Sequence, residues 1–245
     1  MKKITSINNE YIKELVRLHE KKHRDRQQRF LVEGYHLLLE AKDLLEKVLI
    51  VDEKDEVIGV ENILVTNEII NKVGFTKTPQ PIIGVCRYFP KYTLTGERFL
   101  LLDRLQDPGN IGTLVRSAVG FDIDMVVLSD DSVDLYNDKF IRATQGALFK
   151  TKVIVAQLEK VVGELKKQKI KIIGTSLEAS KDLEEIAGEK KYAIILGNEA
   201  SGVSKNLLEM TDVNVKIKIN PTLESLNVGV AGGIIMHYLA MKSKK

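Results

Sequence analysis

Short apolar segments alternate with amphipathic ones throughout the second half of the chain. Segments such as RFLLLD, MVVLS and YAIILG are rich in Val, Ile and Leu and are typical of buried strands. The stretch IGTLVRSAVGF, between the first two of them, carries its apolar residues at helical spacing. Strands that alternate with helices pair in parallel, and the helices cover both faces of the sheet. The pattern therefore predicts an α/β fold with a mostly parallel sheet.

The first third of the chain alternates in the same way over a shorter length. FLVEG at 30–34 predicts a strand, and YHLLLEAKDLLE at 35–46 predicts a helix. FPKYTLTGER at 89–98 is polar, has no apolar period and predicts a linker. We therefore expect a small N-terminal α/β domain and a larger C-terminal one. The expected boundaries are residues 1–92 for the first domain, 93–97 for the linker and 98–245 for the second domain.

Positive charge is concentrated at the beginning of the sequence. Residues 1–29 carry nine Lys and Arg side chains against four acidic ones, although the whole chain has a net charge of only +3. Clustered cations attract nucleic-acid phosphates, so the segment KKHRDRQQR predicts a phosphate-binding surface. The alternative is an ordinary solvated helix face. The candidate RNA-binding residues are Lys21, Lys22, Arg24, Arg26 and Arg29.

The sequence lacks the features of a secreted, membrane or zinc-binding protein. Its one cysteine, Cys86, cannot form an intramolecular disulfide, and its four histidines do not cluster. The N-terminal segment has no apolar signal-peptide core. The longest uncharged run, 225–241, contains Ser, Asn, His and three glycines, so it predicts a buried helix rather than a membrane span. We expect a soluble, cytoplasmic protein without a metal site.

The familiar signatures of nucleotide-binding and hydrolytic enzymes are absent from the sequence. It contains no G-x-G, no Walker phosphate loop, no G-x-S-x-G and no H-E-x-x-H. Three polar loops remain, each after a predicted strand, and open α/β sheets bind ligands at the carboxyl ends of their strands. The three loops are DPGNIGTLVRSA (107–118), ILGNEASGVS (195–204) and INPTLESLNVGVAGG (219–233).

Each loop also has a plain structural interpretation. Pro-Gly-Asn is ordinary turn chemistry, Glu199 could be a charge at a helix start, and Ser225 could be a helix N-cap. Arg116 is harder to explain in this way. The neighbouring positions on its predicted helix hold glycine, alanine and valine, so no acidic side chain of the same helix pairs with it.

Taken together, the three loops resemble the three motifs of the SpoU (TrmH-type) RNA ribose 2′-O-methyltransferases, a branch of the SPOUT superfamily, in order and spacing. RFLVEGYHLLLEA is similar to the small RNA substrate-binding domain often joined to these enzymes. The sequence departs from the family pattern at Ala200, where Gly is common, and at Ile217–Pro221, where Ile-Pro-Met followed by Gly is usual. These departures affect loop shape and leave the motif side chains in place.

The resemblance implies a Rossmann-like sheet whose C-terminal end forms a deep trefoil knot. In this family S-adenosyl-L-methionine (AdoMet) binds in the knot, held mainly by backbone groups of the second and third motifs. Backbone amides and carbonyls can read an adenine, so aliphatic residues can be ligand positions. The implied cofactor-binding residues are Thr175, Leu196, Gly197, Asn198, Ile217, Ile219 and Leu226.

The implied reaction transfers a methyl group from AdoMet to a ribose 2′-hydroxyl and needs no metal. An arginine guanidinium keeps its proton in proteins, so Arg116 is better suited to hold an RNA phosphate and stabilise alkoxide charge than to act as a general base. The phosphate or water would then take the proton. The implied catalytic set is Asn110, Arg116, Glu199, Ser225 and Asn227.

The resemblance also implies a homodimer, with the knot region and the C-terminal helix at the interface. The attached N-terminal domain and its basic helix favour ribosomal RNA as the substrate. Two alternatives stay open, methylation of transfer RNA and a non-catalytic RNA-binding role on the same fold. A nicotinamide-binding or nucleotide-binding domain is disfavoured because its glycine fingerprints are absent.

Overall fold

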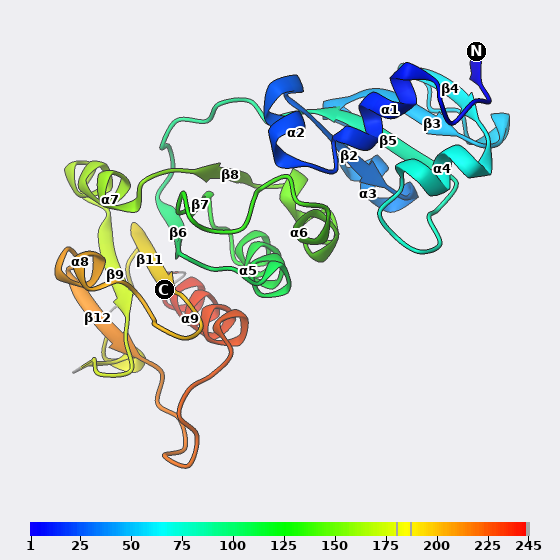
Figure 1. Cartoon of the computed structure of the whole chain (residues 1–245). Helices are drawn as coiled ribbons and strands as arrows, with labels where there is room; N and C mark the ends of the chain where they lie inside the picture. Colours follow the sequence, from blue (N-terminus) through cyan, green and yellow to red (C-terminus); the bar gives the residue numbers. More distant parts are fainter. Residues whose placement is uncertain (180, 187, 244–245) are drawn as a thin grey trace. The chain divides into compact units, whose positions relative to one another are not determined.

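Two compact units make up the chain (Figure 1). The structure is a computed structural model and describes residues 1–179, 181–186 and 188–243. The first unit contains Met1–Pro90 and Tyr136–Phe149, and the second contains Lys91–Leu135 and Lys150–Lys245. Each unit has its own sheet and its own hydrophobic core.

The first unit is built on a five-stranded sheet with the order β1-β4-β3-β5-β2. β4 pairs in parallel with β1 and β3, whereas β5 pairs antiparallel with β3 and β2. Its strands are β1 (Lys2–Ile4), β2 (Arg29–Glu33), β3 (Leu45–Ile50), β4 (Glu61–Val65) and β5 (Ile82–Arg87). Its helices are α1 (Glu10–Arg17), α2 (Lys21–Gln27), α3 (Tyr35–Glu40), α4 (Asn67–Val73) and α6 (Asp138–Ala143). The expected small N-terminal α/β fold is therefore confirmed.

The helix expected over 35–46 is shorter than its apolar pattern suggests. α3 ends at Glu40, and a short 3-10 helix, η1 (Lys42–Leu44), follows it. Leu45 then enters the sheet as the first residue of β3 and pairs with Cys86 of β5. The end of the helical pattern is thus taken by a strand, because tertiary pairing overrides local propensity.

The segment Tyr136–Phe149 belongs to the first unit, although it lies between two strands of the second. The Tyr136 ring stacks on the Tyr88 ring at a centroid distance of 3.6 Å and lies 5.0 Å from the Phe30 ring. The Tyr136 hydroxyl also accepts a hydrogen bond from the Phe89 amide at 3.0 Å. The sequence DDSVDLYNDKFIRATQGALF at 130–149 predicts a helix-containing connection, which α6 provides. Its packing against the first unit is not indicated by the sequence.

The second unit is built on a seven-stranded sheet with the order β10-β12-β9-β11-β6-β7-β8. Every pair of neighbouring strands in this sheet is parallel, which confirms the predicted sheet type. Its strands are β6 (Arg98–Asp103), β7 (Met125–Leu128), β8 (Lys152–Val155), β9 (Lys171–Thr175), β10 (Lys181–Asp182), β11 (Tyr192–Gly197) and β12 (Val213–Lys216). Its helices are α5 (Pro108–Gly120), α7 (Leu158–Lys167), α8 (Lys205–Glu209) and α9 (Val228–Ser243).

Helices cover both faces of this parallel sheet (Figure 1). α7 and α8 pack on one face, where Leu165 and Leu207 share a core with Ile195 of β11. α9 packs on the other face, where the alternation of side chains along β11 directs Leu196. A Cβ at Gly232 of α9 would lie 2.7 Å from the Leu196 side chain, so the absence of a side chain lets the helix approach. The sheet, with the carboxyl ends of its strands, therefore lies between two layers of helices.

The long uncharged run forms α9, as expected, but one side of this helix is exposed. Ile235 and Leu239 are buried, whereas Val230, Ile234 and Met241 are 52%, 39% and 45% exposed. No helix in the part of the chain that the structure describes is long and apolar enough to span a membrane. α9 thus has an inner face that belongs to the core and an outer apolar face.

Candidate cofactor-binding and active site

The second and third polar loops form the wall of one pocket of about 500 Å³. The pocket lies where β9, β11 and β12 end, which is the edge at which parallel sheets bind ligands. Its volume is in the range of small-molecule sites. It is lined by all seven predicted cofactor-binding residues, namely Thr175, Leu196, Gly197, Asn198, Ile217, Ile219 and Leu226. Three of the predicted catalytic residues, Glu199, Ser225 and Asn227, also line it.

The loop that follows β11 is folded tightly against itself. A Cβ at Gly197 would lie only 2.0 Å from the Val203 amide nitrogen, so only glycine fits this approach. The Asn198 carboxamide oxygen accepts hydrogen bonds from the Ala200 and Ser201 amides at 3.0 and 3.2 Å. Gly202 closes the turn with a φ of +66°, a conformation that favours glycine. Short local hydrogen bonds thus shape this side of the pocket.

The Thr175 side chain is used in a contact within the protein. Its hydroxyl donates a hydrogen bond to the Ile195 carbonyl at 2.9 Å and so joins the ends of β9 and β11. Ile217 and Ile219 follow β12 on the far side of the pocket. These positions therefore offer mainly backbone groups and apolar surface to a ligand.

A chain of side-chain hydrogen bonds joins the three loops. The Asn227 side-chain nitrogen, Nδ2, donates a hydrogen bond to the Asn110 side-chain oxygen, Oδ1, at 2.8 Å. The Asn110 side-chain nitrogen, Nδ2, donates in turn to the Glu199 carboxylate at 3.0 Å. The start of α9 sets the direction of these hydrogen bonds. The Asn227 side-chain oxygen accepts from the Gly229 backbone amide at 2.9 Å, so the Asn227 side-chain nitrogen is left to donate. Asn110, Asn227 and Glu199 are thereby fixed relative to one another.

The start of α5 holds Asn110 in this position. Asp107 caps the helix by accepting a hydrogen bond from the Asn110 amide at 2.7 Å, and Pro108 occupies the first turn, as is common at helix starts. Pro-Gly-Asn is therefore a helix start. Its third residue, Asn110, hydrogen-bonds to two residues that line the pocket. The structural interpretation of this sequence thus holds as a helix start, and the catalytic role of Asn110 stays a prediction.

Two predicted catalytic residues, Asn110 and Arg116, are not among the described residues that line the pocket. Asn110 is hydrogen-bonded to the lining residues Glu199 and Asn227, whereas Arg116 has no such link within the described part of the chain. Arg116 lies six residues after Asn110 on α5, which corresponds to a rotation of about 240° around the helix axis. Its side chain is exposed, and no hydrogen bond or ion pair within the described ranges involves it. Arg116 is thus available to a group outside the single chain.

Comparison with known proteins identifies the family. Residues 97–237, more than half of the chain, match the SpoU rRNA Methylase family. The chain belongs to this family. Residues 9–84 also match the MRM3-like substrate binding domain, so the resemblance predicted from the motifs is confirmed for both parts of the chain.

Relatives of this SpoU methylase align over 82% to 98% of its length. It is 37% identical to the 23S rRNA (guanosine(2553)-2′-O)-methyltransferase RlmP of Bacillus subtilis, over 98% of this chain and 99% of that protein. It is 30% identical to the 23S rRNA (guanosine-2′-O-)-methyltransferase RlmB of Xylella fastidiosa, over 82% of this chain and 85% of that protein. The crystal structure of an AdoMet-bound rRNA methyltransferase from Sinorhizobium meliloti has a TM-score of 0.85 at 26% identity, over 98% of this chain and 97% of that one.

The basic segment of this SpoU methylase divides into exposed and structural side chains. Lys21, Lys22 and Arg26 are exposed on α2. Arg24 is 6% exposed, and its guanidinium donates hydrogen bonds to the Leu18 and His19 carbonyls at 2.8 and 2.7 Å. Its inclusion among the RNA-binding residues is therefore wrong, because its donors already hold the corner between α1 and α2. The partly exposed Arg29 pairs with the Glu46 carboxylate.

Neither Cys86 nor a metal-binding cluster offers a second reactive centre within the described residues. Cys86 is fully buried in β5, and this burial raises the pKa of its thiol, which disfavours the nucleophilic thiolate. Among the residues with described positions, no three His, Cys, Asp or Glu side chains are arranged to hold a metal ion. The motif pocket therefore remains the best-supported site of the reaction.

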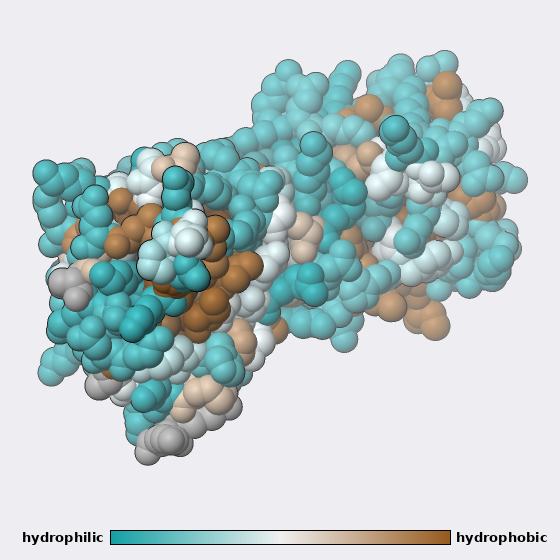
Figure 2. Space-filling view, turned by 90° about the horizontal axis from the view of Figure 1, so that it is seen from below, coloured by the Kyte–Doolittle hydropathy of each residue, from teal (hydrophilic) through white to brown (hydrophobic). Residues whose placement is uncertain are grey.

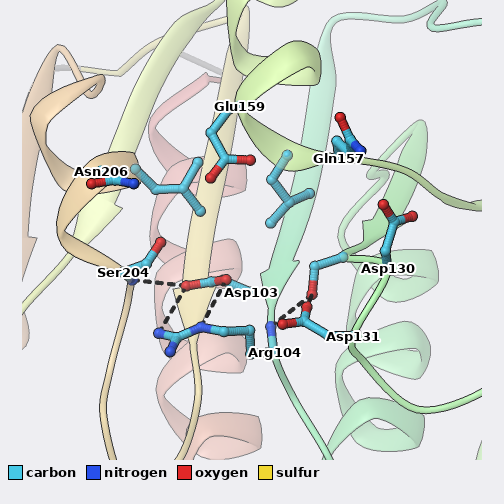
Figure 3. A pocket seen from close by; sticks show the side chains of 11 residues that line it. Asp103, Arg104, Asp130, Asp131, Gln157, Glu159, Ser204 and Asn206 are labelled. Carbon is cyan, nitrogen blue, oxygen red and sulfur yellow. Dashed lines mark hydrogen bonds and ion pairs between the residues drawn. The ribbon is translucent and has the colours of Figure 1, made fainter.

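A second pocket of about 500 Å³ lies beside the motif loops, at the carboxyl ends of β6 and β7 (Figure 3). Its lining includes Asp103 and Arg104, which are separated from the first motif by two residues and which sequence reasoning did not single out. An available sequence signal was the position of Asp103 at the end of a buried apolar strand, where a carboxylate needs partners.

Proposed function

We propose that this chain transfers a methyl group from AdoMet to a ribose 2′-hydroxyl of ribosomal RNA. The observation that carries this proposal is the Asn227–Asn110–Glu199 hydrogen-bond chain at the wall of the motif pocket. It fixes polar side chains from all three family motifs beside a cavity of cofactor size. Family membership and the names of both rRNA-methylating relatives support the same reaction.

The residues of the pocket fit AdoMet. Leu196, Ile217 and Ile235 provide apolar surface for an adenine ring, and the backbone around Gly197 and Ile219 provides hydrogen-bonding groups for its edge. Glu199 and Glu224 provide negative charge on the same lining, which suits a ligand that carries a sulfonium and an ammonium group. AdoMet, when bound, supplies an electrophilic methyl group.

The side chains around the pocket have separate tasks in this proposal. Glu199 accepts from Asn110 through one carboxylate oxygen, and its second oxygen can accept a hydrogen bond from the ribose. Asn110 and Asn227 keep Glu199 in place. Ser225 lines the pocket and can hydrogen-bond to the substrate. The ribose is thereby oriented for in-line attack, and orientation of this kind supplies a large part of enzymatic rate enhancement.

Arg116 holds the RNA phosphate beside the reacting hydroxyl in this proposal. Its guanidinium offers paired donors to a phosphate and stabilises negative charge that develops on the ribose oxygen. The proton passes to that phosphate or to water. Because Arg116 is exposed and does not line the pocket of its own chain, we propose that it serves the pocket of a second copy.

A homodimer would bring these parts together. Val230, Ile234 and Met241 form an exposed apolar strip on α9, which packs beside the Arg116-bearing α5. Figure 2, which views the molecule from below, shows hydrophobic residues gathered on the second unit. We propose that this strip of α9 packs against the same strip of a second copy of the chain. We also propose that the motif loops form the trefoil knot of the SPOUT fold. Light scattering should then give twice the chain mass of 27.6 kDa.

The proposed acceptor is a guanosine of 23S rRNA, because both relatives described above carry names with this specificity. The decisive experiment maps 2′-O-methylation in RNA from cells with and without the gene, together with tritium transfer from AdoMet to purified rRNA. Loss of one rRNA methylation and its return in vitro are expected. Loss of a transfer-RNA methylation would favour that substrate instead, and AdoMet binding without any transfer would favour the non-catalytic alternative.

The exposed cations of α2 should set the salt dependence of RNA binding. Replacing Lys21, Lys22 and Arg26 with alanine should weaken binding and reduce the slope of log K against log salt by about 2 to 3, since each lost phosphate contact removes about 0.7 to 0.9. The matched control replaces Lys160, Lys169 and Lys190, which are equally exposed in the second unit, with alanine. Equal slopes for the two triple variants would show that the exposed side of α2 is an ordinary solvated helix face.

A further inference from the structure

The motif loop of residues 198–204 has contacts outside its own local turn. Two residues at the end of β6, Asp103 and Arg104, make these contacts (Figure 3). β6 and β11 are neighbours in the sheet, and Asp103 stands in register with Gly197. The end of β6 therefore lies directly beside the start of the loop.

Asp103 binds the end of the loop. Its side chain is buried, with only 6% exposed, and one carboxylate oxygen accepts a hydrogen bond from the Ser204 amide at 2.7 Å. The same carboxylate pairs with the Arg104 guanidinium, whose Nε lies 3.2 Å from the other oxygen. A buried carboxylate needs partners of this kind, and here the partners are a loop amide and a cation.

Arg104 binds the middle and the start of the loop. Its guanidinium donates to the Gly202 carbonyl at 3.1 Å, and its own carbonyl accepts from the Asn198 side chain at 2.9 Å. The Arg104 amide donates to the Ser129 hydroxyl at 2.8 Å, which ties the corner to the end of β7. The pair therefore contacts the loop at three points, Asn198, Gly202 and Ser204, and leaves Glu199 to face Asn110.

The backbone of Arg104 makes the role of its side chain testable. Its φ of +58° lies in the left-handed region, where glycine is favoured and a long side chain is not. If the side chain were only a surface group, glycine at this position would relieve strain at no loss. If the guanidinium holds the loop, glycine should loosen the loop even though the backbone strain is relieved.

We propose that Asp103 and Arg104 are positioning residues that hold the loop 198–204 in the conformation that binds AdoMet and presents Glu199. The reason is geometric, since charge-assisted hydrogen bonds restrain the loop at Gly202 and Ser204, and a hydrogen bond from Asn198 restrains its start next to Glu199. This inference rests on the proposed function for the meaning of the loop. Its structural content, a loop held by one ion pair, does not depend on that function.

The first test follows hydrogen exchange of the Ala200, Ser201 and Ser204 amides in the protein without cofactor. In Arg104→Gly these amides should exchange about tenfold faster, because a charge-assisted restraint on the loop is lost. Lys169→Gly is the matched control. Lys169 has the same backbone conformation, with a φ of +59°, and is exposed after α7. Wild-type exchange of the loop in Arg104→Gly would overturn the proposal.

The second test measures the dissociation constant of AdoMet by calorimetry and the Michaelis constant for AdoMet. Arg104→Gly should raise both by about tenfold, whereas Lys169→Gly should leave them unchanged. Arg104→Lys should recover part of the affinity, because an ammonium group can reach one of the two acceptors but lacks the guanidinium fork. Unchanged affinity in Arg104→Gly would refute the positioning role.

The two proposals fail in different ways. A wild-type protein that binds no AdoMet would contradict the proposed function, and the exchange experiment would still decide whether Arg104 holds the loop. A wild-type protein that methylates RNA, together with an Arg104→Gly variant that keeps normal exchange and affinity, would contradict the positioning role alone.

Discussion

Replacing Arg116 with alanine should reduce methyl transfer by at least about 100-fold while leaving AdoMet affinity unchanged, because a positioned donor to developing negative charge contributes about 10²- to 10³-fold. The expectation rests on the place of Arg116, which is exposed on α5 and does not line the cofactor pocket of its own chain. Tritium transfer to rRNA under saturating AdoMet measures the first quantity, and calorimetry measures the second.

Arg116→Lys separates charge from geometry. A lysine keeps the positive charge but cannot offer two parallel donors to a phosphate, so this variant should also be nearly inactive. A fully active lysine variant would show that charge alone is sufficient and would refute the bidentate clamp. Loss of AdoMet affinity in Arg116→Ala would instead place Arg116 at the cofactor.

Mixing two inactive variants tests whether the active site is shared between copies. One variant lacks Arg116, and the other carries Gly197→Ala, which spoils its cofactor pocket. After subunit exchange, half of the dimers are mixed, and each mixed dimer has one intact composite site, so about a quarter of the wild-type activity should return. An inactive mixture that nevertheless forms mixed dimers would show that Arg116 acts within its own chain.

The parallel sheet of the second unit could be predicted because its central strands are continuous apolar runs. β6 and β11 are buried along nearly their whole length, and such strands occur where helices cover both faces. The meeting of the motif loops at one pocket could be predicted for a related reason. Parallel strands end at one edge, so three polar loops that follow such strands must come close together.

The hydrogen bonds that join the motifs could not be predicted from the sequence. Asn110 and Asn227 are 117 positions apart, and nothing local indicates which of their atoms meet. The role of Arg24 was hidden for a similar reason. A cluster of cations indicates attraction to phosphates, but only the folded corner between α1 and α2 shows that this guanidinium binds the Leu18 and His19 carbonyls.

Arg104 illustrates a further limit of sequence reasoning. A positive φ at a non-glycine residue is set by the surrounding contacts, here those with Asp103, Gly202 and Ser129, and no sequence pattern at this position indicates it. Arg116 is the opposite case. Its separation of six residues from Asn110 already indicates different faces of a helix, so its absence from the pocket could have been expected.

Gly197→Ala should abolish AdoMet binding within the measurable range, a loss of at least about 100-fold in affinity. The added Cβ would lie 2.0 Å from the Val203 nitrogen and 2.1 Å from the Gly202 carbonyl carbon, and both are backbone atoms that cannot rotate away. The loop must therefore shift as a whole and take Glu199 with it. The free energy of unfolding should fall by about 1 to 3 kcal/mol, as for other overpacked positions.

Gly163→Ala is the matched control for this substitution. Gly163 lies within α7, and a Cβ there would meet no atom within 4 Å. This variant should keep AdoMet affinity and gain about 0.5 to 1 kcal/mol in stability, because alanine is favoured over glycine in a helix. Calorimetry with AdoMet and urea unfolding compare the two variants. If Gly197→Ala keeps wild-type affinity, the loop after β11 does not form the cofactor wall, because a backbone displaced by that Cβ could not preserve the same contacts.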